Sequence, residues 1–185
     1  MEFKPLTLDG ALLMIPKKHQ DPRGFFTELF REDQWVKQYG SNPFLQDNFS
    51  WSAHGVVRGL HFQDNPPQGK LITCLFGQIV DVLVDIRAGS PTFGKHVCIE
   101  LNGERPMWVW APPGFAHGFA VTSEAGAAVL YKVDNYYNAA SDRCIRWDDP
   151  TLNVEWPDLA SPLVSAKDQA APSFEDYAKS PLFRY

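Results

Sequence analysis

The most informative segment of the chain reads Gly55-Val56-Val57-Arg58-Gly59-Leu60-His61-Phe62-Gln63, with Lys70 seven residues further on. Its apolar and β-branched residues are typical of a strand. Histidines at the positions of both His61 and Gln63 would form a metal-binding pair. A neutral amide, however, is a poor ligand for a transition metal, which prefers imidazole, thiolate or carboxylate. The remaining set of His61, Arg58 and Lys70 therefore suits removal of a proton from carbon beside an anionic ligand better than it suits binding of a metal.

A second histidine closes the segment Pro112-Pro113-Gly114-Phe115-Ala116-His117. With only His61 and His117, and no glutamate in a suitable place after Gln63, a stable metal centre lacks ligands. An isolated histidine is usually a satisfied residue of the core. The two-part motif makes a place for His117 in the binding pocket about as good an interpretation.

His61 is the better candidate for chemistry, because a neutral imidazole is a competent general base at physiological pH. A buried carboxylate usually fixes the tautomer of such a base. The spacing leaves three candidates for that carboxylate open, namely Asp81, Asp85 and Asp168. Tyr131, on the last clear strand, could act as an acid that faces the base, although a tyrosine that only packs a strand is more common.

Arg58 and His61 are an odd number of positions apart, so strict strand alternation sends their side chains to opposite faces. Gly59 lies between them and could mark a β-bulge that re-aims one side chain. The sequence thus predicts either a bulge at Gly59 or a pocket that excludes one of the two residues.

Short apolar segments alternate with turn signals through the middle of the chain, which predicts an all-β sandwich or barrel. Asn102-Gly103 is a strong signal for a two-residue hairpin between the flanking strands. Two short helices are expected. The predicted helices are Glu32–Tyr39, ended by Gly40, and Ser173–Lys179, capped by Ser173. The predicted strands are Leu71–Phe76, Ile79–Ile86, Lys95–Leu101, Met107–Trp110 and Ala127–Val133.

The composition is that of a globular domain rather than of a nucleic-acid-binding or membrane protein. The 185 residues fit one domain spanning 1–185, and from Trp147 onward the chain is expected to wrap the barrel. A net charge of −5 disfavours binding to nucleic acid, and the apolar run 11–15 is too short for a signal peptide or a membrane span. Three widely spaced cysteines favour free thiols in a reducing cytoplasm.

Five motifs in register give the chain a specific resemblance to a known family. They are Asp21-x-Arg23-Gly24-x-Phe26-x-Glu28, Gln46-Asp47-Asn48, Val57-Arg58-Gly59-Leu60-His61-Phe62-Gln63, Pro112-x-Gly114-x-x-His117-Gly118-Phe119 and Ser165-x-Lys167-Asp168. Together they resemble the dTDP-4-dehydrorhamnose 3,5-epimerases of dTDP-L-rhamnose biosynthesis, and the resemblance covers essentially the whole chain. It implies a cupin-type jelly roll that works without metal or cofactor and forms homodimers by exchange of N-terminal strands.

The resemblance also implies roles for individual residues. His61 resembles the general base, Asp168 the carboxylate that orients it, Tyr131 the acid on the other side of the sugar, and Lys70 the residue that stabilises the enolate. Asp142 stands where the family has a glutamate, one methylene longer. The positions that resemble the family's substrate contacts are Arg23, Phe26, Glu28, Gln46, Asp47, Asn48, Arg58, His117, Asp142 and Lys167.

The implied reaction is inversion of carbons 3 and 5 of dTDP-4-dehydro-6-deoxy-D-glucose, which gives dTDP-4-dehydro-L-rhamnose. One alternative is an enzyme that inverts a single carbon, or a ketoisomerase, acting on a related dTDP-4-keto sugar. Another is a sugar-binding protein of the same fold without catalysis, although such a protein has no need of a base, an orienting carboxylate and a phenol together. Gln63 argues against a metal-dependent oxygenase.

Overall fold

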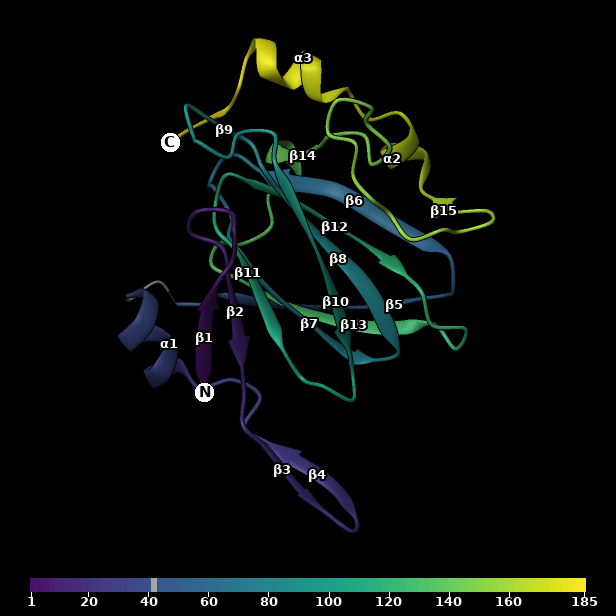
Figure 1. Cartoon of the computed structure of the whole chain (residues 1–185). Helices are drawn as coiled ribbons and strands as arrows, with labels where there is room; N and C mark the ends of the chain where they lie inside the picture. Colours follow the sequence, from purple (N-terminus) through teal and green to yellow (C-terminus); the bar gives the residue numbers. More distant parts are fainter. Residues whose placement is uncertain (41–42) are drawn as a thin grey trace.

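Two β-sheets lie face to face in the computed structural model, which describes residues 1–40 and 43–185 (Figure 1). One sheet has the strand order β1-β2-β11-β7-β13-β5, and the other has the order β10-β8-β12-β6-β14, with β15 paired to β6. This architecture is the all-β jelly roll expected from the sequence. The strands are β1 (Glu2–Pro5), β2 (Leu12–Ile15), β3 (Lys18–Asp21), β4 (Gly24–Thr27), β5 (Gln46–Ser52), β6 (Val56–Gln63), β7 (Lys70–Phe76), β8 (Gln78–Asp85), β9 (Arg87–Ala88), β10 (His96–Asn102), β11 (Trp108–Ala111), β12 (Phe115–Val121), β13 (Ala127–Val133), β14 (Asp142–Cys144), β15 (Leu163–Val164) and β16 (Phe183–Arg184).

The helical elements are few and short. They are α1 (Glu32–Tyr39), α2 (Ala166–Gln169), α3 (Phe174–Lys179) and the 3-10 turn η1 (Ala139–Ser141). Both predicted helices are confirmed. Gly40 ends α1 with a φ of +91°, and the Ser173 side chain accepts a hydrogen bond from the backbone N–H of Asp176 at the start of α3.

The five predicted strands are confirmed as β7, β8, β10, β11 and β13, with ends that differ by at most one residue. The hairpin predicted at Asn102-Gly103 is wrong. The Asn102 side chain does build a tight turn, since its Oδ1 accepts from the backbone N–H groups of Glu104 (3.2 Å) and Arg105 (2.9 Å). However, β10 pairs with β8 and β11 pairs with β2 and β7. The turn therefore crosses from one sheet to the other, because each strand finds its pairing partner on its own side of the core.

Apolar side chains fill the space between the sheets and also cover their outer faces. The central cluster includes Ile72, Leu83 and Val129. A second cluster on the other face of β8 includes Val82, and residues of α3 cover this cluster. On the outer face of the first sheet, Trp35 of α1 packs in a third cluster with Trp108. Strand alternation explains this arrangement, since neighbouring residues of one strand enter different clusters.

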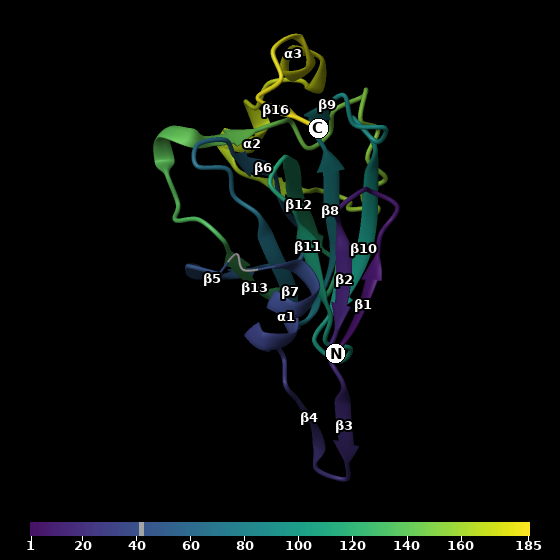
Figure 2. The same cartoon turned by 90° about the vertical axis from the view of Figure 1, so that its left-hand side faces the viewer.

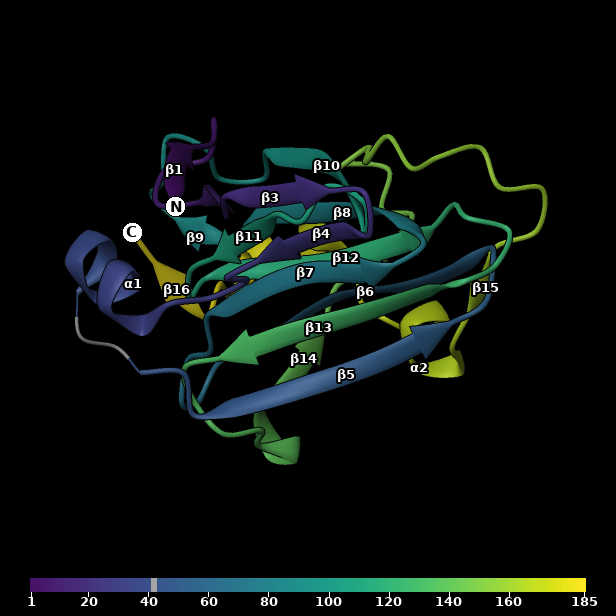
Figure 3. The same ribbon diagram turned by 90° about the horizontal axis from the view of Figure 1, so that it is seen from below.

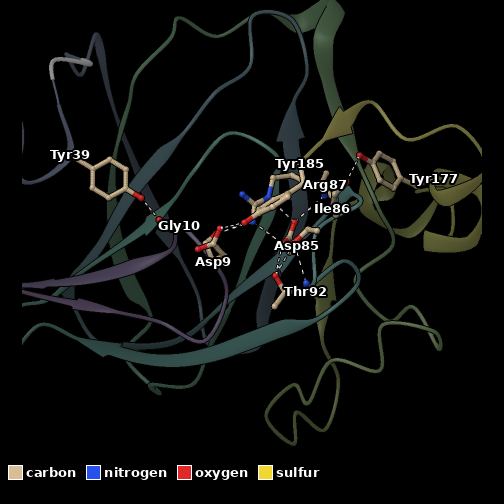
Figure 4. A network of polar contacts seen from close by, with 10 residues as sticks. Asp9, Gly10, Tyr39, Asp85, Ile86, Arg87, Thr92, Tyr177 and Tyr185 are labelled. Carbon is tan, nitrogen blue, oxygen red and sulfur yellow. Dashed lines mark hydrogen bonds and ion pairs between the residues drawn. The ribbon is translucent and has the colours of Figure 1, made fainter.

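The C-terminal segment lies against the second sheet and returns to the N-terminal turn. The hydroxyl of Tyr177 donates to the carbonyl of Ile86 (2.7 Å), and the hydroxyl of Tyr185 donates to the carboxylate of Asp9 (2.8 Å) (Figure 4). The Arg87 guanidinium joins these parts, because it donates both to the Asp9 carbonyl and to the carboxylate of the fully buried Asp85 (2.8 Å each) (Figure 4).

One hairpin stands apart from the two sheets. β3 and β4 pair only with each other and project away from the body of the molecule (Figure 2). Seen from below, β5 and β13 of the first sheet lie nearer the viewer than β6 of the second (Figure 3). Residues of these three strands line the candidate site. Within residues 1–40 and 43–185, no helix has the length and apolar character that crossing a membrane requires.

Candidate active site

Two adjoining hollows of about 180 Å³ each open between the sheets at β5, β6, β7 and β13. They share His61, Lys70 and Tyr131, so we treat them as one cleft. Polar and charged side chains dominate the lining. The residues that line the cleft are Gln46, Asn48, Ser50, Arg58, His61, Phe62, Gln63, Gln68, Lys70, His117, Phe119, Tyr131, Tyr137, Asp142 and Lys167.

His61 on β6 forms a close pair with Asp168 at the edge of the cleft. Its Nε2 lies 2.6 Å from Oδ1 of Asp168, whose residue is 2% exposed. Burial opposes ionisation of Asp168, but the hydrogen bond and charge of His61, together with hydrogen bonds from Gly59 and Ser165, outweigh burial and hold the pKa of that carboxyl below its usual range. An ionised carboxylate accepts from Nε2–H, which leaves the lone pair on Nδ1 of His61. This tautomer is the one that can act as a base.

The C-terminal segment brings Asp168 to His61 across 107 residues of sequence. β15 runs parallel to β6, and Ser165 then caps α2 by accepting from the backbone N–H of Asp168 (3.1 Å). Of the three carboxylates that the sequence left open, only Asp168 contacts His61 among the described residues. Asp85 accepts from Arg87 instead, and Asp81 contacts His117.

A β-bulge at Gly59 turns both Arg58 and His61 toward the cleft. This is the first of the two alternatives that the sequence predicted. β12 faces β6 with His117 opposite His61 but Phe119 opposite Arg58, so two residues of β6, Gly59 and Leu60, oppose the single Gly118 of β12. Gly59 has a φ of +130°, and a Cβ added there would lie 2.6 Å from the Cα of Gly118. Only glycine fits this close approach of the two strands.

Lys70, the first residue of β7, is 9% exposed and reaches toward the same part of the cleft. Its Nζ donates to the carbonyl of His61 (3.1 Å). Burial lowers the pKa of the Lys70 amine to about 8, although the carboxylates of Asp142 and Asp81 oppose this shift. The ammonium is thus a cation at neutral pH and close to losing its proton.

Tyr131 faces His61 from the opposite sheet. It lies on β13, paired with Asn48 of β5 on one side and with Ile72 of β7 on the other. Burial raises the pKa of its phenol, so the hydroxyl keeps its proton across the physiological range. The cleft therefore has an imidazole on one wall and a protonated phenol on the other.

His117 on β12 joins the lining as the second histidine of the site. It is 7% exposed, and its Nε2 lies 2.7 Å from Oδ2 of Asp81, which is fully buried. Both readings of the sequence describe part of what is seen, because His117 is a satisfied buried residue that also borders the cleft beside Phe119.

The entrance of the cleft carries further predicted residues, together with two that the sequence did not single out. Lys167 donates to Asp142 (2.5 Å), and Tyr137 donates from its hydroxyl to the same carboxylate (3.2 Å). Gln46 accepts from the backbone N–H of Tyr137 (3.1 Å). Tyr137 and Gln68 were missed, as was Ser50 elsewhere in the lining. The only signal for Tyr137 is its place in an aromatic pair just beyond a strand that carries a candidate acid.

Four predicted substrate contacts do not lie at this cleft within the described part of the chain. Arg23, Phe26 and Glu28 lie on or just beyond the projecting β3–β4 hairpin, where all three are exposed. Asp47 lies between two lining residues of β5, so alternation turns it to the opposite face, where Lys132 donates to it (2.7 Å).

Gln63 occupies the place of a second metal ligand but makes different contacts. Its amide donates to the carbonyl of Pro66 (2.9 Å), and its Oε1 accepts from the backbone of Asn138 (2.8 Å). Among residues 1–40 and 43–185, no group of three His, Cys, Asp or Glu side chains gathers in a way that could hold a metal ion.

The site can now be compared with known proteins. A family model described as dTDP-4-dehydrorhamnose 3,5-epimerase matches residues 5–176. The chain belongs to the dTDP-4-dehydrorhamnose 3,5-epimerase family. A dTDP-4-dehydrorhamnose 3,5-epimerase of Sinorhizobium fredii is 45% identical to it over 175 residues, covering 94% of this chain and 89% of the relative.

Solved structures of epimerases share the fold of the whole chain. The crystal structure of dTDP-6-deoxy-D-glucose-3,5-epimerase from Legionella pneumophila, in complex with dTDP-4-keto-L-rhamnose, superposes with a TM-score of 0.94 at 42% identity, covering 100% of this chain and 98% of that one. A 3′-monoepimerase from Streptomyces bikiniensis, in complex with dTDP-quinovose, superposes with a TM-score of 0.92 at 32% identity, covering 98% and 92%. Membership in the dTDP-4-dehydrorhamnose 3,5-epimerase family confirms the resemblance, the jelly-roll fold and the isomerase class expected from the sequence.

Proposed function

We propose that this member of the dTDP-4-dehydrorhamnose 3,5-epimerase family inverts carbons 3 and 5 of dTDP-4-dehydro-6-deoxy-D-glucose to give dTDP-4-dehydro-L-rhamnose. The observation that carries the proposal is the pair of His61 and Tyr131 on opposite walls of one cleft. The Legionella pneumophila enzyme, which shares the fold of the whole chain, was crystallised with dTDP-4-keto-L-rhamnose, and this supports a nucleotide-sugar ligand.

The chemistry needs a base and an acid on opposite faces of the sugar. The C4 ketone acidifies the C–H bonds at carbons 3 and 5, and Nδ1 of His61 takes the proton to leave an enolate. The Lys70 ammonium stabilises the developing charge on the enolate oxygen. The phenol of Tyr131 then returns a proton from the other face, and solvent restores both groups. The substrate is neither oxidised nor reduced, so the reaction requires no redox cofactor.

Other side chains of the cleft are suited to hold the nucleotide sugar. Arg58 and Lys167 supply positive charge for the diphosphate. His117 borders the sugar end of the cleft, where Asp81 fixes its ring. We assign the nucleoside to the polar residues of the entrance, Gln46, Asn48, Asp142 and Tyr137, which line one of the two hollows.

The direct test is incubation of the substrate in deuterated water, followed by proton NMR. We expect both C–H signals beside the ketone to exchange and the product to have inverted configuration at both carbons. Exchange at one carbon only would favour the single-site alternative, and a monoepimerase with the same fold is known. No exchange at either carbon, or stoichiometric iron or zinc on elemental analysis, would contradict the proposal.

The alkaline limb of the pH profile should belong to Lys70. Because burial lowers its pKa to about 8, we expect kcat/KM to fall as the pH rises through about 8, when the ammonium becomes a neutral amine. Lys70→Arg should be slower but should keep its rate to about pH 10, since a guanidinium stays charged. The measurement is kcat/KM against pH for both proteins. An identical alkaline fall in the two would assign this limb to another group.

We also propose a homodimer in which the β3–β4 hairpin of each protomer completes the cleft of its partner. Phe25 and Phe26 are 42% and 67% exposed on this hairpin, and Phe49, Trp51 and Phe76 are exposed on the first sheet. Such an apolar surface is typical of an interface. Light scattering should give twice the mass of one chain. Mixed protomers of Arg23→Ala and His61→Ala should regain about a quarter of wild-type activity, because half of the dimers then contain one intact site of two.

Residues 1–185 form one domain in this proposal, and the enzyme works in the cytoplasm without a nucleic-acid partner. The thiols of Cys74, Cys98 and Cys144 are all free, which fits a reducing compartment. A net charge of −5 disfavours binding to nucleic acid. Cell fractionation that recovers the protein outside the cytoplasm would contradict the location.

A further inference from the structure

Side-chain amides join two loops at the entrance of the cleft. The first loop, residues 64–69, connects β6 to β7, and the second, residues 134–138, follows β13. The four carboxamides lie in or beside these loops, and we call their set the amide lock. Its members are Gln63, Gln68, Asn135 and Asn138.

Gln63 is the central member of the amide lock. Its Nε2 donates to the carbonyl of Pro66 in the first loop (2.9 Å) and to the carbonyl of Tyr136 in the second (3.1 Å). Its Oε1 accepts from the backbone N–H of Asn138 (2.8 Å). The residue is 3% exposed, so these three hydrogen bonds are largely shielded from solvent. A buried carboxamide with both N–H groups and its oxygen engaged is costly to replace, because each backbone partner would be left unpaired.

The other three amides connect the loops in both directions. Gln68 donates to the carbonyl of Asn135 (2.7 Å), and Asn135 donates back to the carbonyl of Pro67 (2.8 Å). Asn138 donates to the carbonyl of Asn65 (2.7 Å). These bonds cross between the loops at successive positions, so the second loop cannot shift without breaking several of them.

The second loop carries Tyr137 into the lining of the cleft. The backbone N–H of Tyr137 donates to Gln46, and its hydroxyl donates to Asp142, which also accepts from Lys167. Tyr137 itself is 58% exposed, so packing alone does not hold it in place. The position of these contacts therefore depends on the bonds that fix the loop behind them.

We propose that Gln63 is a positioning residue of the site. Acting through the backbone of Tyr136 and Asn138, it holds Tyr137 where the nucleoside end of the substrate enters. An amide serves here better than a histidine or a carboxylate, because the position requires two donors and one acceptor at once. The identity of the ligand rests on the proposed function; the amide lock itself rests on the contacts within the chain.

Gln63→Met tests the inference, since methionine keeps the length of the side chain and removes all three hydrogen bonds. In the free protein, hydrogen exchange of the Asn138 amide should become at least about tenfold faster. The dissociation constant for dTDP by calorimetry, and KM, should rise about tenfold, whereas kcat should stay within about threefold because His61 and Lys70 are untouched. Asn102→Ala is the matched control: it removes an amide that builds a turn outside the cleft, and it should leave both constants unchanged.

Two results would overturn the inference. One is faster exchange at Asn138 with an unchanged dissociation constant for dTDP, and the other is a loss of kcat with an unchanged KM. Should Gln63→Met not fold, Asn135→Ala breaks the same lock at a partly exposed position, and its dissociation constant should rise about threefold. No change in that constant would equally overturn it. A wild-type protein that binds dTDP but releases no inverted sugar would refute the proposed function. The dTDP-binding tests of Gln63 would still apply to such a protein.

Discussion

His61→Ala should lower kcat by at least about a thousandfold while the dissociation constant for dTDP stays within about threefold of the wild-type value. Alanine removes the imidazole whose Nε2 is held at 2.6 Å by the buried carboxylate of Asp168 and whose Nδ1 keeps its lone pair. The contacts of the entrance do not involve the imidazole. Single-turnover kinetics with calorimetry of dTDP binding measure the two quantities separately.

The matched control is His54→Ala, which removes an exposed imidazole in a turn away from the cleft and should keep wild-type kcat. The kcat of Asp168→Asn should lie between the values of these two variants. An amide can leave the His61 ring in place, but it no longer favours the tautomer with its lone pair on Nδ1. Unchanged turnover in His61→Ala would remove this residue from the mechanism.

Tyr131→Phe should separate proton exchange from inversion. His61 still removes the proton and can return a deuteron to the same face, so exchange in deuterated water should continue within about tenfold of the wild-type rate. Inversion should fall by at least about a hundredfold, because the phenylalanine ring has no proton to deliver from the opposite wall. Proton NMR in deuterated water reads both rates from one sample.

Tyr136→Phe supplies the control for this experiment. Its side chain is 65% exposed and lies outside the lining of the cleft, so both exchange and inversion should match the wild type. Equal loss of exchange and inversion in Tyr131→Phe would show that the phenol acts in proton removal, and an unchanged inversion rate would show that the acid is another group.

Local patterns in the sequence predicted the strands and helices well. The apolar run Ala127–Val133 and the caps at Gly40 and Ser173 are properties of neighbouring residues, and the structure confirms the strand and both caps. The turn at Asn102-Gly103 shows the limit of such patterns. The Asn102 side chain builds a turn as predicted, but the sheet to which each flanking strand belongs depends on contacts far along the chain.

The sequence likewise predicted one part of the candidate site and left another part open. Motif spacing identified His61, Lys70, His117 and Tyr131, and the structure brings all four to one cleft. Spacing could not separate Asp47 from its neighbours, because the face of β5 that lines the cleft is fixed by pairing with β13. Nor could it reveal the contacts of Gln63, because two of its three partners belong to a loop more than seventy positions away.

The sequence by itself determined the all-β fold class and the short helices, since these follow from the periodicity and composition of adjacent residues, and its resemblance to the family indicated most of the residues that carry the chemistry. The tertiary structure decided three things that residue spacing left open: that Asp168 is the carboxylate at His61, that the bulge at Gly59 turns Arg58 into the same cleft, and that Gln63 bonds to two loops. The reason is physical. Contacts between residues many tens of positions apart form only when the sheets pack, and packing of distant segments leaves no periodic signal in the chain.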